Sequence, residues 1–260
     1  MYGHNCPFVI VLHGGPAAPG YMKPVAERLS EYFRVLEPFQ RGSSDEPLTV
    51  ARHVQDLQDV IETYCGNEEP LLVGHSWGAM LSLAWAAEHP TIPKALVLVG
   101  CGTFDTASRD RMNTLREQRM DESLRRRLQQ LSQKYQNPDI RLAVMGGLYQ
   151  QIDSVDLVEI ENHLHRCDAA AHEQTWADIV RLQKESIYPA AFASIHCPVV
   201  MLHGNDDPHP GDMIRDSLSP YLPQLEYISW SHCGHYPWLE KTARDDFYRI
   251  LTDWLRHQSV

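Results

Sequence analysis

Ser76 is the residue of this 260-residue chain whose type and surroundings most clearly predict chemistry. It lies in the segment GHSWG, directly after the apolar residues LLV and directly before the helical pattern AMLSLAWAAEH. A strand, a tight turn and a helix in this order strain the serine backbone, so small residues, here Gly74 and Gly78, must flank it. The helix start also presents free backbone N–H groups to a developing anion. This context favours a nucleophilic serine over one that merely caps a helix.

His235 is the predicted general base, because a serine hydroxyl is a poor nucleophile until a base takes its proton. When the serine lies on such a turn, an acid and then a histidine follow it in the chain, and the histidine comes after the last strand. His235 meets this condition, since SHCGHYPWLEK follows the last predicted strand and precedes an amphipathic terminal helix. His232 is its nearest rival. Cys233 is a weaker alternative as nucleophile, because a catalytic thiol needs an activating base of its own.

Two acids, Asp206 and Asp207, lie in VVMLHGNDDPHPG, after the strand that precedes the last one. One of them would orient the imidazole, set its tautomer and stabilise its cation. We favour Asp207, which directly precedes Pro208 and comes three residues after Gly204. Asp206 would then be a turn residue, the usual role of an aspartate in such a loop. The sequence separates the two only weakly, so Asp206 stays an alternative.

Acyl transfer also needs donors for the oxyanion of the tetrahedral intermediate, and we predict the backbone N–H groups of Gly15 and Trp77 for this role. Gly15 lies in the first glycine loop, HGGP, and Trp77 directly follows the serine. Three aromatic residues, Tyr149, Trp176 and Trp238, are candidates for substrate contacts, although such residues are more often core packing. The histidines lack the HExxH spacing of a zinc site, so we expect neither a catalytic metal nor a cofactor.

Apolar runs that alternate with helical patterns predict the elements that must position these residues. The first strand-like run begins at Phe8. Further runs cover Phe33 to Leu36, Pro70 to Gly74, Ala95 to Gly100, Pro198 to His203 and Leu225 to Trp230. Helical patterns cover Tyr21 to Tyr32, Val50 to Tyr64 and Ala79 to Glu88. This alternation is typical of an α/β fold with a doubly wound, mostly parallel sheet.

The alternation breaks after Thr103, where a polar, helix-rich stretch runs to about Ser194. We therefore predict a core formed by residues 1–103 and 195–260 and an inserted helical cap formed by residues 104–194. The cap would lie over the carboxyl ends of the strands, where ligands bind in such sheets. Between residues 109 and 127 arginines alternate with acidic residues, which indicates the solvated face of cap helices, with a contact to an anionic substrate or partner as the alternative.

Four motifs in this order, HGGP, QRG, GHSWG and GHYPWLE, resemble the α/β-hydrolase superfamily and, within it, the branch of prolyl aminopeptidases and related esterases. The resemblance implies a serine hydrolase that cleaves a small-molecule carboxylic ester or amide through an acyl-enzyme. A prolyl aminopeptidase-like peptidase is the first alternative. In the aminopeptidases, acidic cap residues bind the free amine of the substrate, and here four glutamates are candidates by composition alone: Glu159, Glu161, Glu173 and Glu185. A C–C bond hydrolase or a ligand-binding receptor on the same scaffold is a further alternative.

The N-terminal region is short, because only seven residues precede the first predicted strand at Phe8. Members of the superfamily usually place two further strands there. We therefore predict a shortened sheet of six strands, with Phe33 to Leu36 near an edge that a loop or a second subunit must protect. A homodimer is one way to provide that protection.

Composition and charge restrict the remaining partners. The formal net charge of −11 argues against nucleic acid, whose phosphates require a basic face. We expect no membrane partner, since no apolar run approaches the roughly 20 residues that cross a bilayer. The short polar start does not resemble a secretory signal, so a cytoplasmic location is expected. Six scattered cysteines without a CxxC spacing are interpreted as free thiols.

Overall fold

A computed structural model of the chain describes residues 1–3, 7–158 and 166–259. At its centre lies a six-stranded sheet in the order β2-β1-β3-β4-β5-β6, and every neighbouring pair is parallel. The strands are β1 (Phe8–Leu12), β2 (Arg34–Leu36), β3 (Leu71–His75), β4 (Ala95–Val99), β5 (Val199–Gly204) and β6 (Leu225–Trp230). The predictions of an α/β fold and of six strands are confirmed.

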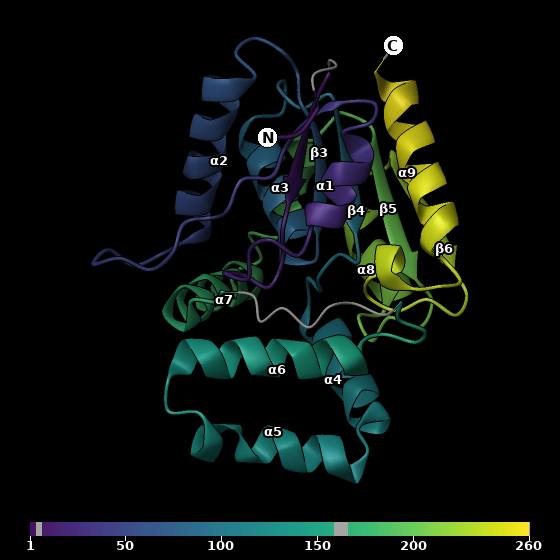
Figure 1. The fold of residues 1–260 in the computed structure, drawn as a ribbon. Coiled ribbons are helices and arrows are strands. Elements are labelled where there is room, and N and C mark those ends of the chain that lie inside the picture. The colour runs from purple at the N-terminus through teal and green to yellow at the C-terminus, as the bar shows by residue number, and fades with distance from the viewer. Residues whose placement is uncertain (4–6, 159–165, 260) are drawn as a thin grey trace.

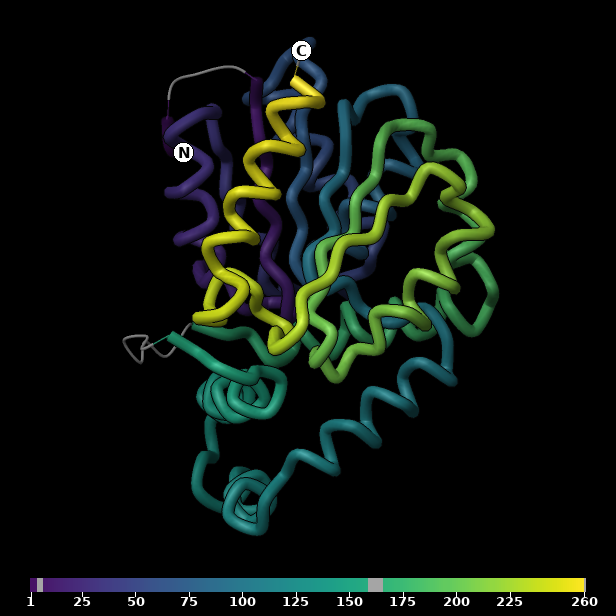
Figure 2. Tube along the Cα trace, turned by 90° about the vertical axis from the view of Figure 1, so that its right-hand side faces the viewer, coloured from purple at the N-terminus to yellow at the C-terminus, as the bar shows by residue number. Residues whose placement is uncertain are grey.

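Helices cover both faces of the sheet (Figure 2). One face packs against α1 (Lys23–Leu29) and α9 (Arg244–Gln258), and the other against α2 (Val50–Tyr64), α3 (Trp77–Glu88) and α8 (Gly211–Leu218). In β1, Val9 and Val11 point to the first face, whereas Ile10 and Leu12 point to the second. Because successive strand side chains alternate between two buried faces, these strands form continuous apolar runs in the sequence.

Within the described residues, four α-helices lie between β4 and β5 in the sequence: α4 (Thr106–Arg119), α5 (Glu122–Lys134), α6 (Pro138–Ile152) and α7 (Ala169–Lys184). The first three lie beyond the carboxyl ends of the strands, in the lower part of Figure 1. Helix α7 returns to the body of the molecule, where Gln174 and Asp178 accept the backbone N–H groups of Leu48 and Val50. The division into core and cap at residues 104 and 194 stays a prediction.

Two short 3-10 helices complete the described part, η1 (Ala190–Ser194) and η2 (Pro237–Leu239). The predicted edge position of β2 is confirmed, and two backbone hydrogen bonds of 2.9 and 2.8 Å join Tyr2 antiparallel to Val35. The chain therefore covers part of this edge itself. The five cysteines within the described ranges are free thiols, and Cys6 lies outside these ranges. No helix in the part of the chain that the structure describes is both long and apolar enough to span a membrane.

Candidate active site

Ser76 occupies a strained turn between β3 and α3. Its φ of 54° and ψ of −116° lie in a region that non-glycine residues rarely adopt. A Cβ added at Gly74 would lie 2.3 Å from the carbonyl oxygen of Gly78, and one added at Gly78 would lie 2.3 Å from that of Leu12. The two flanking glycines are therefore needed for close packing of strand and helix, as the sequence predicts. Ser76 itself stays half-buried at the start of α3.

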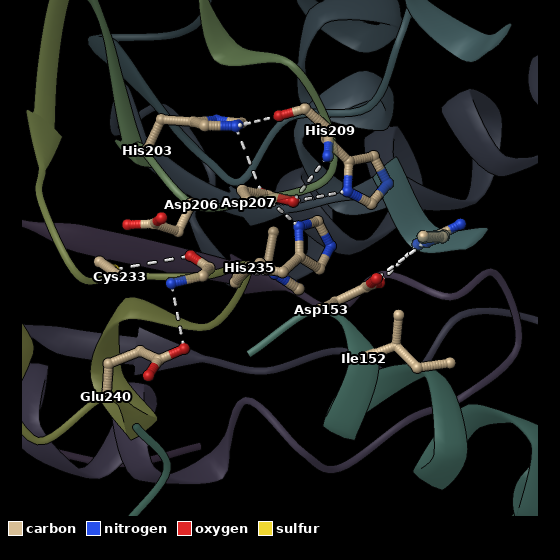
Figure 3. Close-up of polar contacts among 12 residues, drawn as sticks. Ile152, Asp153, His203, Asp206, Asp207, His209, Cys233, His235 and Glu240 are labelled. Atoms are coloured by element: carbon tan, nitrogen blue, oxygen red, sulfur yellow. Dashed lines mark hydrogen bonds and ion pairs between the residues drawn. The ribbon is translucent and has the colours of Figure 1, made fainter. Parts of the chain in front are cut away.

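His235 and Asp207 form a buried pair. The Nδ1 atom of His235 lies 2.6 Å from Oδ2 of Asp207, in the loops that follow β6 and β5 (Figure 3). Burial on its own would raise the pKa of Asp207, but the imidazoles of His235, His209 and His203 outweigh it and hold this pKa well below its usual range. Asp207 is therefore an ionised acceptor that keeps the Nδ1–H tautomer of His235.

The alternative candidates, Asp206, His232 and Cys233, lie in surroundings that differ from those of the pair formed by His235 and Asp207. The carboxylate of Asp206 accepts the backbone N–H of His232 at 2.9 Å, which makes Asp206 a turn residue. His232 is exposed and has a φ of 53°. Cys233 is fully buried, and burial raises the pKa of its thiol. The geometry thus favours Asp207 over Asp206 and His235 over its neighbours.

The turn at Ser76 and the imidazole of His235 both lie against the end of β4. The backbone N–H of Ser76 donates to the carbonyl of Val99 at 2.9 Å. The next residue, Gly100, lies directly under the imidazole, since a Cβ there would be 3.1 Å from Nδ1 of His235. The serine turn and the histidine loop are therefore packed against the same strand end.

His75, beside the serine, joins three loops of the site. Its Nε2 lies 2.9 Å from the carbonyl oxygen of His235, and its Nδ1 lies 2.7 Å from the hydroxyl of Tyr21, which also accepts the backbone N–H of Gly14 at 2.6 Å. A carbonyl can only accept, so Nε2 of the neutral ring carries the proton and Tyr21 donates to Nδ1. Burial, followed by the nearby imidazole of His235, lowers the pKa of His75 well below its usual value, which keeps the ring neutral.

The two predicted oxyanion donors are each adjacent in sequence to a residue of the serine turn or to one that packs against it. Gly15 is exposed and follows Gly14, where an added Cβ would lie 2.8 Å from Cβ of Ser76. Trp77 is the first residue of α3, so its backbone N–H has no acceptor within the helix. Gln40, from the QRG motif, links both regions. Its Nε2 donates to the carbonyl of His13 at 2.7 Å, and its Oε1 accepts the indole N–H of Trp77 at 2.8 Å.

The three predicted substrate contacts lie in different surroundings. Tyr149 is half-buried on α6, with its ring 4.8 Å from the guanidinium of Arg116, and Trp176 is half-buried on α7 against the core. Trp238 is only 1 % exposed, and its ring lies 4.8 Å from that of His75. Trp238 therefore packs within the core beside these loops, and its burial does not favour a substrate contact.

Two arginines of α4 contact the loops of the site, whereas other members of the arginine run are exposed, as expected for a solvated face: Arg111, Arg125, Arg126 and Arg127. Arg116 makes two hydrogen bonds of 2.8 and 2.5 Å to the buried carboxylate of Asp153, whose carbonyl accepts the backbone N–H of His235 at 2.8 Å. Arg119 donates to the carbonyl of Asp206. The alternating charges in the sequence do not reveal which side chains turn toward the body of the molecule.

A family model described as the alpha/beta hydrolase family matches residues 9–249. The chain belongs to this family. Among solved structures, this α/β hydrolase is similar to an esterase from Thermogutta terrifontis, with a TM-score of 0.66 and 18 % identity over 100 % of this chain and 92 % of that one. It is also similar to a proline iminopeptidase from Mycobacterium smegmatis, with a TM-score of 0.63 and 17 % identity over 97 % and 90 %. These likenesses show the fold.

Curated relatives support the predicted resemblance to the aminopeptidase and esterase branch. A proline iminopeptidase from Lactobacillus delbrueckii subsp. lactis is 22 % identical over 271 residues, which cover 96 % of this chain and 90 % of that protein. A cis-3-alkyl-4-alkyloxetan-2-one decarboxylase from Shewanella oneidensis is 28 % identical over 104 residues, 37 % of this chain. The second match spans only 33 % of the decarboxylase.

The donor set Asp207, His209 and His235 also has the spacing of a possible metal site in this α/β hydrolase. The two imidazole rings, however, are stacked with an interplanar angle of 16°, so their lone pairs lie in nearly parallel planes and do not converge on one ion. Both Nδ1 atoms already lie within hydrogen-bond distance of the carboxylate, at 2.8 and 2.6 Å. The arrangement fits a shared carboxylate better than a metal centre.

Glu240 is a buried residue of the GHYPWLE motif whose role the sequence does not reveal. Its carboxylate accepts three backbone N–H groups: Gly234 at 3.0 Å, Val155 at 3.0 Å and Asp156 at 2.6 Å. We expect Glu240→Gln to lower the free energy of unfolding by about 3 kcal/mol, because the amide N–H₂ cannot accept these bonds. Urea denaturation measures this, with the exposed Glu173→Gln as control. Equal stability of the two variants would contradict the assigned role.

Three buried histidines predict how stability depends on pH. Burial lowers the pKa of His13, His53 and His209 to about 4. The unfolded chain binds their protons from about pH 6.5 downward, whereas the folded protein does so only near pH 4, so stability falls as the pH drops through this window. The expected slope is at most about 4 kcal/mol per pH unit. Urea denaturation at about pH 7 and about pH 5 measures it, and equal midpoints would contradict the prediction.

Proposed function

We propose that this chain is a serine hydrolase that cleaves a small-molecule carboxylic ester or amide through an acyl-enzyme. Ser76 is the nucleophile, His235 the general base and Asp207 the orienting acid, with Gly15 and Trp77 as oxyanion donors. The observation that carries the proposal is the buried 2.6 Å pair of His235 and Asp207, which packs against the same strand end as the strained serine turn.

The chemistry follows from these positions. Oγ of Ser76 attacks the substrate carbonyl carbon while Nε2 of His235 takes the hydroxyl proton. Asp207 stabilises the imidazolium that forms, and the backbone N–H groups of Gly15 and Trp77 stabilise the oxyanion. The tetrahedral intermediate collapses when His235 returns the proton to the leaving alcohol or amine. A water then repeats the sequence on the acyl-enzyme and releases the acid and Ser76.

An aminopeptidase is the second candidate, because the similarity to the Lactobacillus proline iminopeptidase covers nearly the whole chain. Such an enzyme needs an unpaired carboxylate near the site to bind the substrate ammonium. Glu173 and Glu185 are exposed, and Glu185 pairs with Arg181 at 2.6 Å. Asp153 is neutralised by Arg116. Glu159 and Glu161 lie outside the described residues. These surroundings favour a substrate without a free ammonium.

Intact-mass spectrometry after exposure to a fluorophosphonate tests the proposal. We expect a single adduct on the wild-type protein, none on Ser76→Ala, and a normal adduct on Ser82→Ala, a buried serine of the same helix. p-Nitrophenyl esters compared with a proline p-nitroanilide then separate the esterase from the aminopeptidase. A wild-type protein that binds the reagent without forming an adduct would contradict the serine mechanism and favour a ligand-binding receptor.

A further inference from the structure

The carboxylate of Asp207 contacts the imidazoles of more than one histidine, as Figure 3 shows. Oδ2 lies 2.6 Å from Nδ1 of His235 and 3.3 Å from Nε2 of His203. Oδ1 lies 2.8 Å from Nδ1 of His209 and also accepts the backbone N–H of His209 at 2.8 Å. A triad needs only the bond to His235, so the additional donors require an explanation.

His209 matches His235 in tautomer and in orientation. An ionised carboxylate can only accept, so both Nδ1 atoms carry hydrogen and both Nε2 atoms are free of it in the neutral rings. The ring centroids are 4.1 Å apart with an interplanar angle of 16°. His209 and His235 therefore form a stacked pair whose Nδ1 atoms share one carboxylate.

His209 stays neutral in this environment. Burial, followed by the neighbouring imidazole of His235, lowers its pKa to about 4, although Asp207 acts in the opposite direction. Several charged and titratable groups face His209. His203 lies on β5 and Asp207 in the loop after it, and His235 lies after β6. His75 on β3 and Arg116 on α4 complete this environment. A neutral donor on Oδ1 withdraws part of the negative charge that Asp207 offers to the imidazolium of His235.

We propose that His209 is a positioning residue of the triad. It donates two hydrogen bonds to Oδ1 of Asp207 and so limits how strongly this carboxylate stabilises the imidazolium of His235. This inference rests on the proposed serine mechanism. The imidazolium of His235 is then stabilised less strongly than it would be beside an unshared carboxylate.

The pH profile of fluorophosphonate labelling tests this role without knowledge of the natural substrate. In His209→Phe a stacked ring and the backbone N–H remain but the Nδ1 donor is lost. We expect the acid limb of its labelling rate to move up by about one pH unit. In His209→Asn the side-chain Nδ2 can donate from the position of Nδ1, so its acid limb should stay with that of the wild type.

The outcomes separate this inference from the proposed function. If the wild type is labelled but the wild type, His209→Phe and His209→Asn share the same acid limb, the role of His209 is overturned and the serine mechanism stays intact. A wild type that is never labelled at Ser76 would overturn both. If His209→Phe does not fold, the downfield Nδ1–H proton resonances give a second measurement. Besides the Nδ1–H of His13, which donates to the carbonyl of Gly14, two carboxylate-bound Nδ1–H resonances are expected in the wild type and one in His209→Asn. Retention of both carboxylate-bound resonances in His209→Asn would overturn the proposal.

Discussion

Ser76→Ala is expected to reduce turnover by about 10⁶-fold, because the proposed acyl-enzyme forms on the Oγ atom of Ser76. The backbone of residue 76 keeps its positive φ with either side chain, so the free energy of unfolding should change by less than about 0.5 kcal/mol. Initial rates on a p-nitrophenyl ester and urea denaturation of the same samples measure both effects.

Ser82→Ala is the matched control for this substitution. The Oγ atom of Ser82 donates to the carbonyl of Gly78 at 2.9 Å and is buried on the same helix. We expect a small loss of stability and a rate close to that of the wild type. Ser76→Ala protein that still turns over at the wild-type rate would rule out the serine mechanism.

Asp207→Asn is expected to lower kcat by about 10⁴-fold, and Asp206→Asn by less than about tenfold. In Asp207→Asn the new side-chain amide would donate to Nδ1 of His235 and favour the tautomer with hydrogen on Nε2, which cannot take the serine proton. Within the described residues, the carboxylate of Asp206 accepts a hydrogen bond from the turn at His232, at 2.9 Å. Steady-state kinetics on one ester measures both variants.

The relative loss of kcat in these two variants decides which aspartate orients the imidazole. A larger loss in Asp206→Asn than in Asp207→Asn would move the orienting role to Asp206, against the 2.6 Å contact of Asp207 with His235. Equal small losses would mean that the imidazole is oriented without either carboxylate. Circular dichroism of both variants excludes unfolding as the cause of a loss.

Local patterns were sufficient for most of the fold. Helix α2 was predicted from Val50 to Tyr64 and is observed with these bounds, since its amphipathic repeat is a local signal. The buried strands were recognisable because both faces of a parallel sheet require apolar side chains. The serine turn was recognisable for a similar reason, because its geometry demands glycines at two fixed positions.

Roles that depend on contacts between distant segments were not recognisable in this way. Arg116 resembles many other exposed helix charges in the sequence, yet packing of α4 directs it to Asp153. Trp238 is an aromatic close to the base in the sequence, yet the histidine loop places it in the core. His209 has no sequence signal for its contact with Asp207, because the bond depends on the path of the loop after β5.

The amino-acid sequence alone therefore specified the order of the elements and the chemical types of the candidate site, since both arise from neighbours along the chain. The partners of each polar side chain were decided by the packed structure. Hydrogen bonds act over about 3 Å, and only the folded chain brings residues such as Ser76, Asp207 and His235 to one end of the sheet. The packed structure therefore decided two features, the choice of Asp207 over Asp206 and the pair of histidines on the carboxylate of Asp207.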